Sequence, residues 1–423
     1  MNKQNFINDK FFFISSILYV LIPIFLVTGP FLPDLSLSLI CLLFIIKTSL
    51  EKNLDIFKNK FFIIFILFYL ILLISSFLSE YSSFSFQRSI PYLRFGIFSV
   101  AIYSIISNNP KILKYLVFVF FLILLVLSID SFYEFFFGKN IFGWKKIDSN
   151  FRITSFFGND EVLGSYVARF FPFIMSLIFF SKKEFNLNIN NYQISLIVTI
   201  SFFITLISGE RTSLAIIIIS IILTILCCKN TRKILLFSLT LILFFSSLLI
   251  ATNPQLKERF YNQVISQMDI SNPQERIKVF SKTYEGHYII AYKMFKEKPI
   301  VGHGVKSFRK YCSKPENFLY DYACTTHPHN TFMQLLAETG IFSFLTVFSL
   351  FIAVSYKLFR IFLKVSFSKN SNHNDSLTMI YIFFFSNLFP FLPSGSFFNN
   401  WMSTIYFMPI GYTIYLYKKT LQE

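Results

Sequence analysis

Long apolar segments recur along the whole chain, and they decide what the chain can fold into. A helix needs about 20 residues to cross the hydrocarbon core of a bilayer. Inside a bilayer the backbone has no water to bind, so only helices and closed barrels span it. Only 14% of the residues are charged, compared with about 25% in a typical soluble protein. The sequence therefore predicts an all-α polytopic membrane protein with about twelve transmembrane helices, near Phe11–Thr28, Leu35–Ile46, Phe61–Ser79, Ile90–Ser107, Tyr115–Ile129, Tyr166–Ser181, Ile194–Ser208, Thr212–Cys228, Ile234–Thr252, Thr331–Tyr356, Leu377–Leu392 and Trp401–Tyr417.

Lysine and arginine residues are distributed unevenly between the loops. Counting from an inside N-terminus, the inside loops carry most of the basic residues, while the short outside loops 29–34, 209–211 and 393–400 carry almost none. Because basic residues in short loops stay on the cytoplasmic side, both termini are predicted to be cytoplasmic. No small-residue cleavage site follows the first span, so we expect it to be retained. The net charge of +17 then reflects topology and attraction to lipid headgroups, and a nucleic-acid partner is not expected.

This topology places two long segments outside the membrane, from Asp130 to about Leu163 and from Asn253 to Asn330. The second segment is the one that can hold a small subdomain. The chain then divides into N-terminal transmembrane helices (1–252), a loop subdomain (253–330) and C-terminal transmembrane helices (331–423). Cys312 and Cys324 are the two cysteines of the loop subdomain. In an oxidising compartment they can pair, and the alternative is two free thiols.

Three arginines lie at the ends of, or inside, apolar segments. Arg211 follows Ser208-Gly209-Glu210 in a minimal turn between two spans, and Arg94 and Arg169 lie within spans. Buried cations in a span usually face a cavity or a partner, and guanidinium groups bind phosphate oxygens in a bidentate manner. The pattern favours a pocket for a strongly anionic group such as a pyrophosphate. The alternatives are structural ion pairs, such as Arg211 with Glu210, or side chains that reach the headgroups.

A histidine-rich turn precedes the long apolar helix predicted from Thr331. In Thr326-His327-Pro328-His329-Asn330, the proline keeps His327 extended, and Asn330 is a good N-cap residue. His329 is a candidate general base or hydrogen-bond donor to a phosphate, and His327 and Asn330 are candidate substrate contacts. A purely structural cap remains possible. A zinc site is less favoured because paired spacings such as C-x₂-C are missing. Glu338, two helical turns further on, is expected to be a helix-packing partner.

These motifs together resemble a known family. The segment from Gly286 to Phe344, with Pro299-Ile300-Val301-Gly302-His303-Gly304, Phe308-Arg309 and the His-Pro-His-Asn turn, resembles the Wzy_C core of the O-antigen ligase and O-antigen polymerase superfamily. Further matching motifs are Ser208-Gly209-Glu210-Arg211-Thr212, the stretch from Phe142 to Tyr166 with Arg152 and Asp160-Glu161, and Pro393-Ser394-Gly395-Ser396. The resemblance extends over most of the chain from about Tyr92 onward.

The resemblance implies a GT-C-like, metal-independent, inverting glycosyltransferase that needs no cofactor. Its donor would be a glycan on undecaprenyl pyrophosphate at the periplasmic face of the bacterial inner membrane. The acceptor would be lipid A-core for a ligase, or a second lipid-linked glycan for a polymerase. The family's catalytic residues correspond to His329 and Arg211, and Arg152 matches a motif position for substrate binding. Glu210 replaces a small residue of many relatives, which would weaken phosphate attraction unless Glu210 pairs elsewhere.

Two other functions share part of this pattern. A polymerase or a protein O-oligosaccharyltransferase would have the same motifs and differ in its acceptor. A transporter or flippase of lipid-linked sugars would also be a polytopic membrane protein. Transporters tend to show inverted repeats and broken midplane helices, and the sequence shows no such pairing. We therefore expect a ligase-like enzyme with its active site on the periplasmic side.

Overall fold

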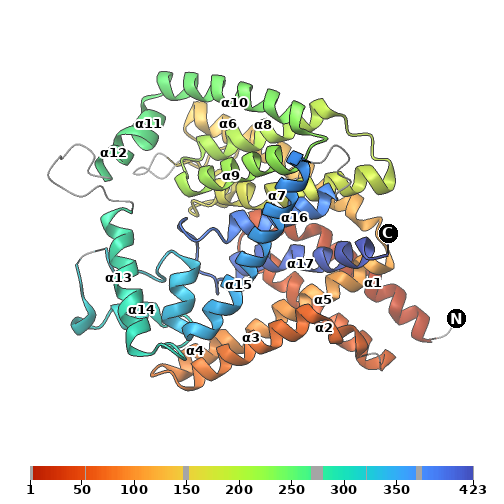
Figure 1. Ribbon diagram of the computed structural model, residues 1–423, viewed down its shortest axis with the longest axis vertical. Helices are drawn as coiled ribbons and strands as arrows, with labels where there is room; N and C mark the ends of the chain where they lie inside the picture. Colours follow the sequence, from red (N-terminus) through yellow and green to blue (C-terminus); the bar gives the residue numbers. More distant parts are fainter. Residues whose placement is uncertain are drawn as a thin grey trace.

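The computed structural model describes residues 3–52, 54–145, 152–267, 280–320, 322–367 and 374–422, and within these ranges the chain forms helices and no β-strand. The bundle consists of long helices, and shorter helices α11 to α14 lie at one of its ends (Figure 1). The helices of the bundle are α1 (Lys3–Thr28), α2 (Phe31–Glu51), α3 (Lys60–Phe77), α4 (Ser82–Ser89), α5 (Leu93–Asn108), α6 (Ile112–Phe137), α7 (Leu163–Phe185), α8 (Asn191–Ile207), α9 (Arg211–Cys227), α10 (Arg232–Thr252), α15 (Thr331–Phe367), α16 (Asp375–Asn387) and α17 (Asn400–Thr420). The shorter ones are α11 (Pro254–Lys257), α12 (Gln263–Gln267), α13 (Lys282–Glu297) and α14 (Phe308–Cys312).

Each predicted apolar segment coincides with a helix of the bundle. In the described part of the chain, 8 helical stretches are long and apolar enough to cross a membrane, and α8 and α9 are shorter apolar helices. The chain is therefore an all-helical, multi-pass membrane protein. The number of crossings and the GT-C-like arrangement stay predictions.

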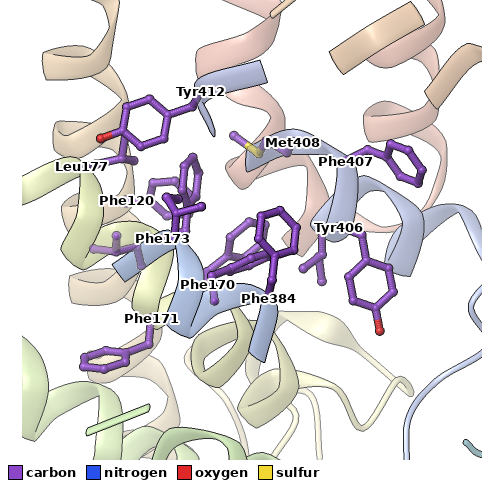
Figure 2. Packing of buried hydrophobic residues seen from close by; sticks show 14 of the residues in the cluster. Phe120, Phe170, Phe171, Phe173, Leu177, Phe384, Tyr406, Phe407, Met408 and Tyr412 are labelled. Carbon is purple, nitrogen blue, oxygen red and sulfur yellow. The ribbon is translucent and has the colours of Figure 1, made fainter. Parts of the chain in front are cut away.

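Helix α7 lies at the centre of the bundle and packs against α6, α8, α9 and α16. Its side chains are buried nearly all round from Leu163 to Ser181. Figure 2 shows the aromatic packing around it, where the Phe173 ring lies 5.9 Å from Phe120 and 5.8 Å from Tyr412 between ring centroids. A helix that is apolar on every face is stable only when other helices surround it. Helix α7 therefore provides a fixed support for the polar residues at its N-terminus.

Helix α15 is broken at Gly340, where the backbone has φ 74° and ψ −173°. The loop before α14 fills the break, because Gly304 N–H donates to the Glu338 carbonyl at 2.7 Å and Ile341 N–H donates to the Pro299 carbonyl at 2.9 Å. Ser75 Oγ of α3 donates to the same Glu338 carbonyl at 2.9 Å. Backbone groups freed by the break thus find partners, and the loop segment is fixed to the bundle.

A second, smaller core joins the short helices to α15. It contains Met294 of α13, Phe308 and Tyr311 of α14, and Ala337 of α15. Cys312 and Cys324 form a disulfide in the structure, with Cα atoms 5.3 Å apart. This bond links the end of α14 to the segment that leads into the histidine-rich turn.

Replacing Gly340 with alanine tests the helix break. A Cβ at this position would lie 2.1 Å from the Ile300 carbonyl oxygen, and the positive φ is itself unfavourable for alanine. Gly138→Ala is the matched control, because Gly138 also has a positive φ and nothing lies within 4 Å of its Cβ position. We expect Gly340→Ala to destabilise the protein by roughly 1–3 kcal/mol more than Gly138→Ala, the usual cost of overpacking. Thermal unfolding of the two detergent-purified variants measures the difference, and equal melting temperatures would contradict it.

Candidate active site

A cleft of about 1080 Å³ opens at the end of the bundle that carries α11 to α14. Turns that are distant in the sequence line it: the α1–α2 turn, the segment before α7, the α8–α9 turn, the loop subdomain and the α16–α17 segment. All of these turns lie in segments that the charge pattern predicts to be outside. The basic side chains of the lining are Arg152, Arg169, Arg211, Arg259, Lys306 and Arg309.

Arg211 and Arg259 form a pair of cations whose hydrogen-bond partners are neutral. Arg211 Nη1 donates to Gln267 Oε1 at 2.8 Å, and Arg259 Nε donates to the Gly209 carbonyl at 3.0 Å. Burial, together with the positive charges of Arg152 and Arg211, lowers the pKa of Arg259 to about 10. Both arginines stay charged at neutral pH. Because the partners are uncharged, the positive potential of this pair remains available to an anionic ligand.

The other two arginines of this region are held differently. Arg152 forms an ion pair with Glu161 at 2.5 Å. Arg169 is buried in α7, where its Nε donates to Ser165 Oγ and its Nη1 donates to Asn387 Oδ1, both at 3.0 Å. Arg152 is therefore partly neutralised, while Arg169 fixes α7 to α16 and still lines the cleft.

Three histidines cluster at the cleft, and two of them, His327 and His329, line it. The His329 ring centroid lies 4.1 Å from that of His327 and 5.2 Å from that of His287 on α13. Tyr284, one turn before His287, has its ring 5.8 Å from His329. Tyr284 also raises the pKa of Arg259, which places it close to the arginine pair. It therefore connects the arginines to the histidines.

Burial makes these histidines weak bases. Burial, with a smaller effect of the neighbouring His287, lowers the pKa of His329 to about 4. Burial lowers the pKa of His327 to about 3, with added effects from His329 and other charges. His329 is consequently neutral at pH 7 and has a free nitrogen lone pair that can accept a proton. Its backbone lies in the left-handed region at φ 51°, and its carbonyl accepts from Ser394 N–H at 2.9 Å.

Glu210 does not pair with Arg211. It is buried, and its carboxylate accepts from the N–H groups of Gly164 at 2.6 Å and Ser165 at 3.0 Å, and from Ser213 Oγ at 2.8 Å. Burial raises the pKa of Glu210 to about 7, although the hydrogen bonds from these donors act to lower it. The Glu210 side chain thus binds free amides at the N-terminus of α7 and joins α7 to α9. It does not neutralise the charge of Arg211.

Two of the predicted substrate contacts lie outside the cleft lining. Arg94 forms an ion pair with Asp34 of α2 at 2.5 Å, so its charge is matched inside the bundle. Asn330 caps α15, where its Oδ1 accepts from Phe332 N–H at 3.0 Å and its Nδ2 donates to the Pro390 carbonyl at 2.7 Å. Both side chains therefore have structural partners, and their substrate contacts stay predictions. The residues that do share the cleft are Arg152, Arg169, Arg211, His327 and His329.

Five cleft or near-cleft residues were not assigned a role from the sequence: Arg259, Tyr284, His287, Lys306 and Arg309. Tyr284 and His287 are three residues apart in a helix, which places them on one face, and this spacing is the signal that could have identified them. Arg309 lies in a motif of the family resemblance. Among the residues that the structure describes, no group of three or more His, Cys, Asp or Glu side chains is arranged to hold a metal ion.

The chain was compared with known families and proteins. Residues 196–348 match the O-antigen ligase family (Wzy_C). The family resemblance of the sequence is thereby confirmed. The matched segment includes Arg211, Arg259, His287, Arg309 and His329, so it supplies most of the cleft's basic groups. No curated protein matched the chain. This segment is therefore similar to the O-antigen ligase family, whose members are glycosyltransferase-like membrane enzymes.

The lowered histidine pKa values predict a pH-dependent stability. The ordinary pKa of histidine is about 6.5, so between about pH 4 and 6.5 the folded protein binds fewer protons at His329 than the unfolded chain does. Stability is then lost as the pH falls through this window. We expect His329→Gln, which removes one titrating group, to lose about 1 kcal/mol less than the wild type between pH 7 and pH 5. Thermal melting at both pH values checks this, and an equal loss in both proteins would contradict it.

Proposed function

We propose that this protein transfers a glycan from undecaprenyl pyrophosphate to a hydroxyl group of lipid A-core, as an O-antigen ligase, at the periplasmic face of the bacterial inner membrane. The observation that carries the proposal is that one cleft contains Arg211, Arg259 and His329, with Tyr284 between the arginines and the histidine. A leaving-group site and a base therefore lie within one substrate-sized space.

The arginine pair suits the pyrophosphate leaving group. As the glycosidic bond lengthens, negative charge grows on the phosphate oxygen that leaves. Arg211 and Arg259 present guanidinium groups whose present partners are the neutral Gln267 side chain and the Gly209 carbonyl. Charges that are fixed before the reaction stabilise this developing charge without reorganisation. The interaction strengthens in the transition state and so lowers the barrier.

His329 suits the role of general base. Its lowered pKa keeps it neutral at the working pH, and the rings of His327, His287 and Tyr284 hold it in place. The acceptor hydroxyl would attack the anomeric carbon from the face opposite the leaving group. Its proton passes to His329 as the new carbon–oxygen bond forms, and the pyrophosphate departs with the electron pair of the broken bond. This displacement inverts the anomeric configuration, as the family resemblance implies.

The distribution of charge supports an enzyme over a transporter. The basic side chains of the cleft gather at one end of the bundle, beside the turns that are predicted to be outside. A carrier of lipid-linked sugars needs polar groups along its path through the membrane. Arg94, which lies inside the bundle, is matched by Asp34.

Substitution of the two principal residues tests the mechanism. In liposomes that contain the purified protein, undecaprenyl-pyrophosphate-linked glycan and lipid A-core, we expect Arg211→Gln and His329→Gln each to reduce transfer about 10²–10³-fold, the usual loss for one fixed electrostatic contact. Arg360→Gln is the matched control, because Arg360 contacts Tyr356 far along α15 and does not line the cleft. Transfer at the wild-type rate by either variant would remove that residue from the mechanism.

Exchange of the acceptor tests the type of enzyme. A ligase transfers the glycan to lipid A-core, whereas a polymerase requires a second lipid-linked glycan. Growth of the lipid-linked glycan without transfer to lipid A-core would contradict the ligase proposal, and movement of the donor across the bilayer without any transfer would favour a flippase.

A further inference from the structure

The cleft contains a second pair of cations that the proposed mechanism does not use. Lys306 lies in the turn just before α14, Arg309 lies three residues further on in the first turn of α14, and both line the cleft. Burial lowers the pKa of Lys306, the Glu338 carboxylate raises it, and the positive charge of Arg309 lowers it, so Lys306 has both a carboxylate and the Arg309 guanidinium near it. Within the described residues, no salt bridge joins either side chain to a carboxylate, and the buried Arg309 Nε has no hydrogen-bond partner. Neither side chain therefore forms a direct ion pair among the described residues, and the Glu338 carboxylate that acts on Lys306 is bound to backbone N–H groups.

Glu338 fixes the turn that carries this pair by hydrogen bonds to its backbone. The buried Glu338 carboxylate accepts from the backbone N–H groups of Lys306 at 2.9 Å and Phe308 at 3.2 Å, and from Gln334 Nε2 at 2.9 Å. Lys306 is held in the left-handed region at φ 59°, a conformation that costs free energy for a residue other than glycine. The carboxylate thus holds Lys306 and Arg309 in position. It forms its hydrogen bonds with the backbone of the turn and not with the two side chains.

A series of neighbouring side chains links the arginine pair, the histidines and the second pair. Tyr284 adjoins both Arg259 and His329, the His329 ring contacts His327, and His327 is in turn affected by the charge of Arg309. His327 Nε2 is buried and has no hydrogen-bond partner among the described residues. These neighbours link the proposed leaving-group site to the proposed base, and the charge of Arg309 links the base's neighbour His327 to the second cation pair.

This order decides which substrate the second pair meets. In an inverting displacement the leaving group and the attacking hydroxyl lie on opposite sides of the anomeric carbon. If Arg211 and Arg259 bind the leaving pyrophosphate and His329 binds the attacking hydroxyl, the rest of the acceptor extends past His329 toward Lys306 and Arg309. Guanidinium and ammonium groups in such a site bind oxyanions.

We propose that Lys306 and Arg309, with His327, form a subsite for an oxyanion substituent, phosphate or carboxylate, on the acceptor glycan. The inference rests on the proposed function for the assignment of the acceptor side. The subsite selects acceptors that carry the anion close to the attacking hydroxyl. The site residues of the proposed transfer, Arg211 and His329, are not part of it.

Direct binding tests the subsite without requiring transfer. The probes are core oligosaccharide released from lipid A, the same oligosaccharide after removal of its phosphates, and the same oligosaccharide after reduction of its carboxyl groups. The released oligosaccharide carries no lipid, so attraction to a membrane surface does not enter. The wild type, Lys306→Gln, Arg309→Gln and the double variant are reconstituted in nanodiscs. Lys310→Gln is the matched control, because Lys310 belongs to the same helix, is exposed and does not line the cleft.

We expect each cleft variant to bind the untreated oligosaccharide on the order of 10-fold more weakly, the usual effect of losing one charge-assisted hydrogen bond. Lys310→Gln should bind like the wild type. Removal of the phosphates, or reduction of the carboxyl groups, should weaken binding to the wild type and leave the double variant unaffected, and the treatment that has this effect identifies the anion. Equal wild-type affinity for all three oligosaccharides would overturn the subsite.

The donor provides the second readout. If Lys306→Gln and Arg309→Gln raise the KM for the undecaprenyl-pyrophosphate donor and leave acceptor binding unchanged, the pair binds the pyrophosphate and the inference is wrong. If the wild type discriminates between the oligosaccharides but transfers no glycan to lipid A-core, the subsite stands and the proposed ligase function fails. Normal donor KM in each variant also shows that the variant is folded.

Discussion

The buried carboxylates near the cleft bind backbone N–H groups, and the positive charge of the cleft depends on this. Glu210 accepts from the amides of Gly164 and Ser165, and Glu338 accepts from those of Lys306 and Phe308. A buried carboxylate needs such donors, because burying it without partners costs several kcal/mol. Had either carboxylate paired with a cleft cation, the pair would have been electrically neutral. Both carboxylates instead bind backbone N–H groups. They therefore fix the shape of the cleft without forming ion pairs with its cations.

The same contacts make the cleft rigid. Glu210 joins the N-terminus of the buried helix α7 to that of α9, and Glu338 lies just before the break of α15 at Gly340. Residues of the loop subdomain fill this break and so are fixed to the bundle. The disulfide between Cys312 and Cys324 ties α14 to the histidine-rich turn. Groups from segments far apart in sequence are therefore held in fixed positions, as electrostatic catalysis requires.

The sequence predicted the helical bundle because hydropathy is a local property. Each apolar segment could be recognised from its own residues, and each coincides with a helix. Arg211 and His329 could be found because both lie in short motifs with a family resemblance. The ion pair of Arg94 could not be predicted, because Asp34 is 60 residues away and the pairing depends on how α2 packs on α5. Glu210 was expected to weaken the anion site unless it pairs elsewhere, and the sequence does not show that its partners are the amides at the N-terminus of α7. The spacing of Tyr284 and His287 on α13 could have identified one helix face, whereas the approach of Arg309 to His327 depends on how α14 packs beside the histidine-rich turn, which no local pattern reveals.

The central claim is that Arg211, Arg259 and His329 act on one donor molecule in one cleft. A cryo-EM structure of the protein in nanodiscs with a non-transferable phosphonate analogue of the undecaprenyl-pyrophosphate-linked glycan tests it most directly. The account predicts density for the two phosphorus groups against Arg211 and Arg259, with the first sugar directed toward His329. Density for these groups elsewhere, with His329 out of reach of the anomeric carbon, would contradict it.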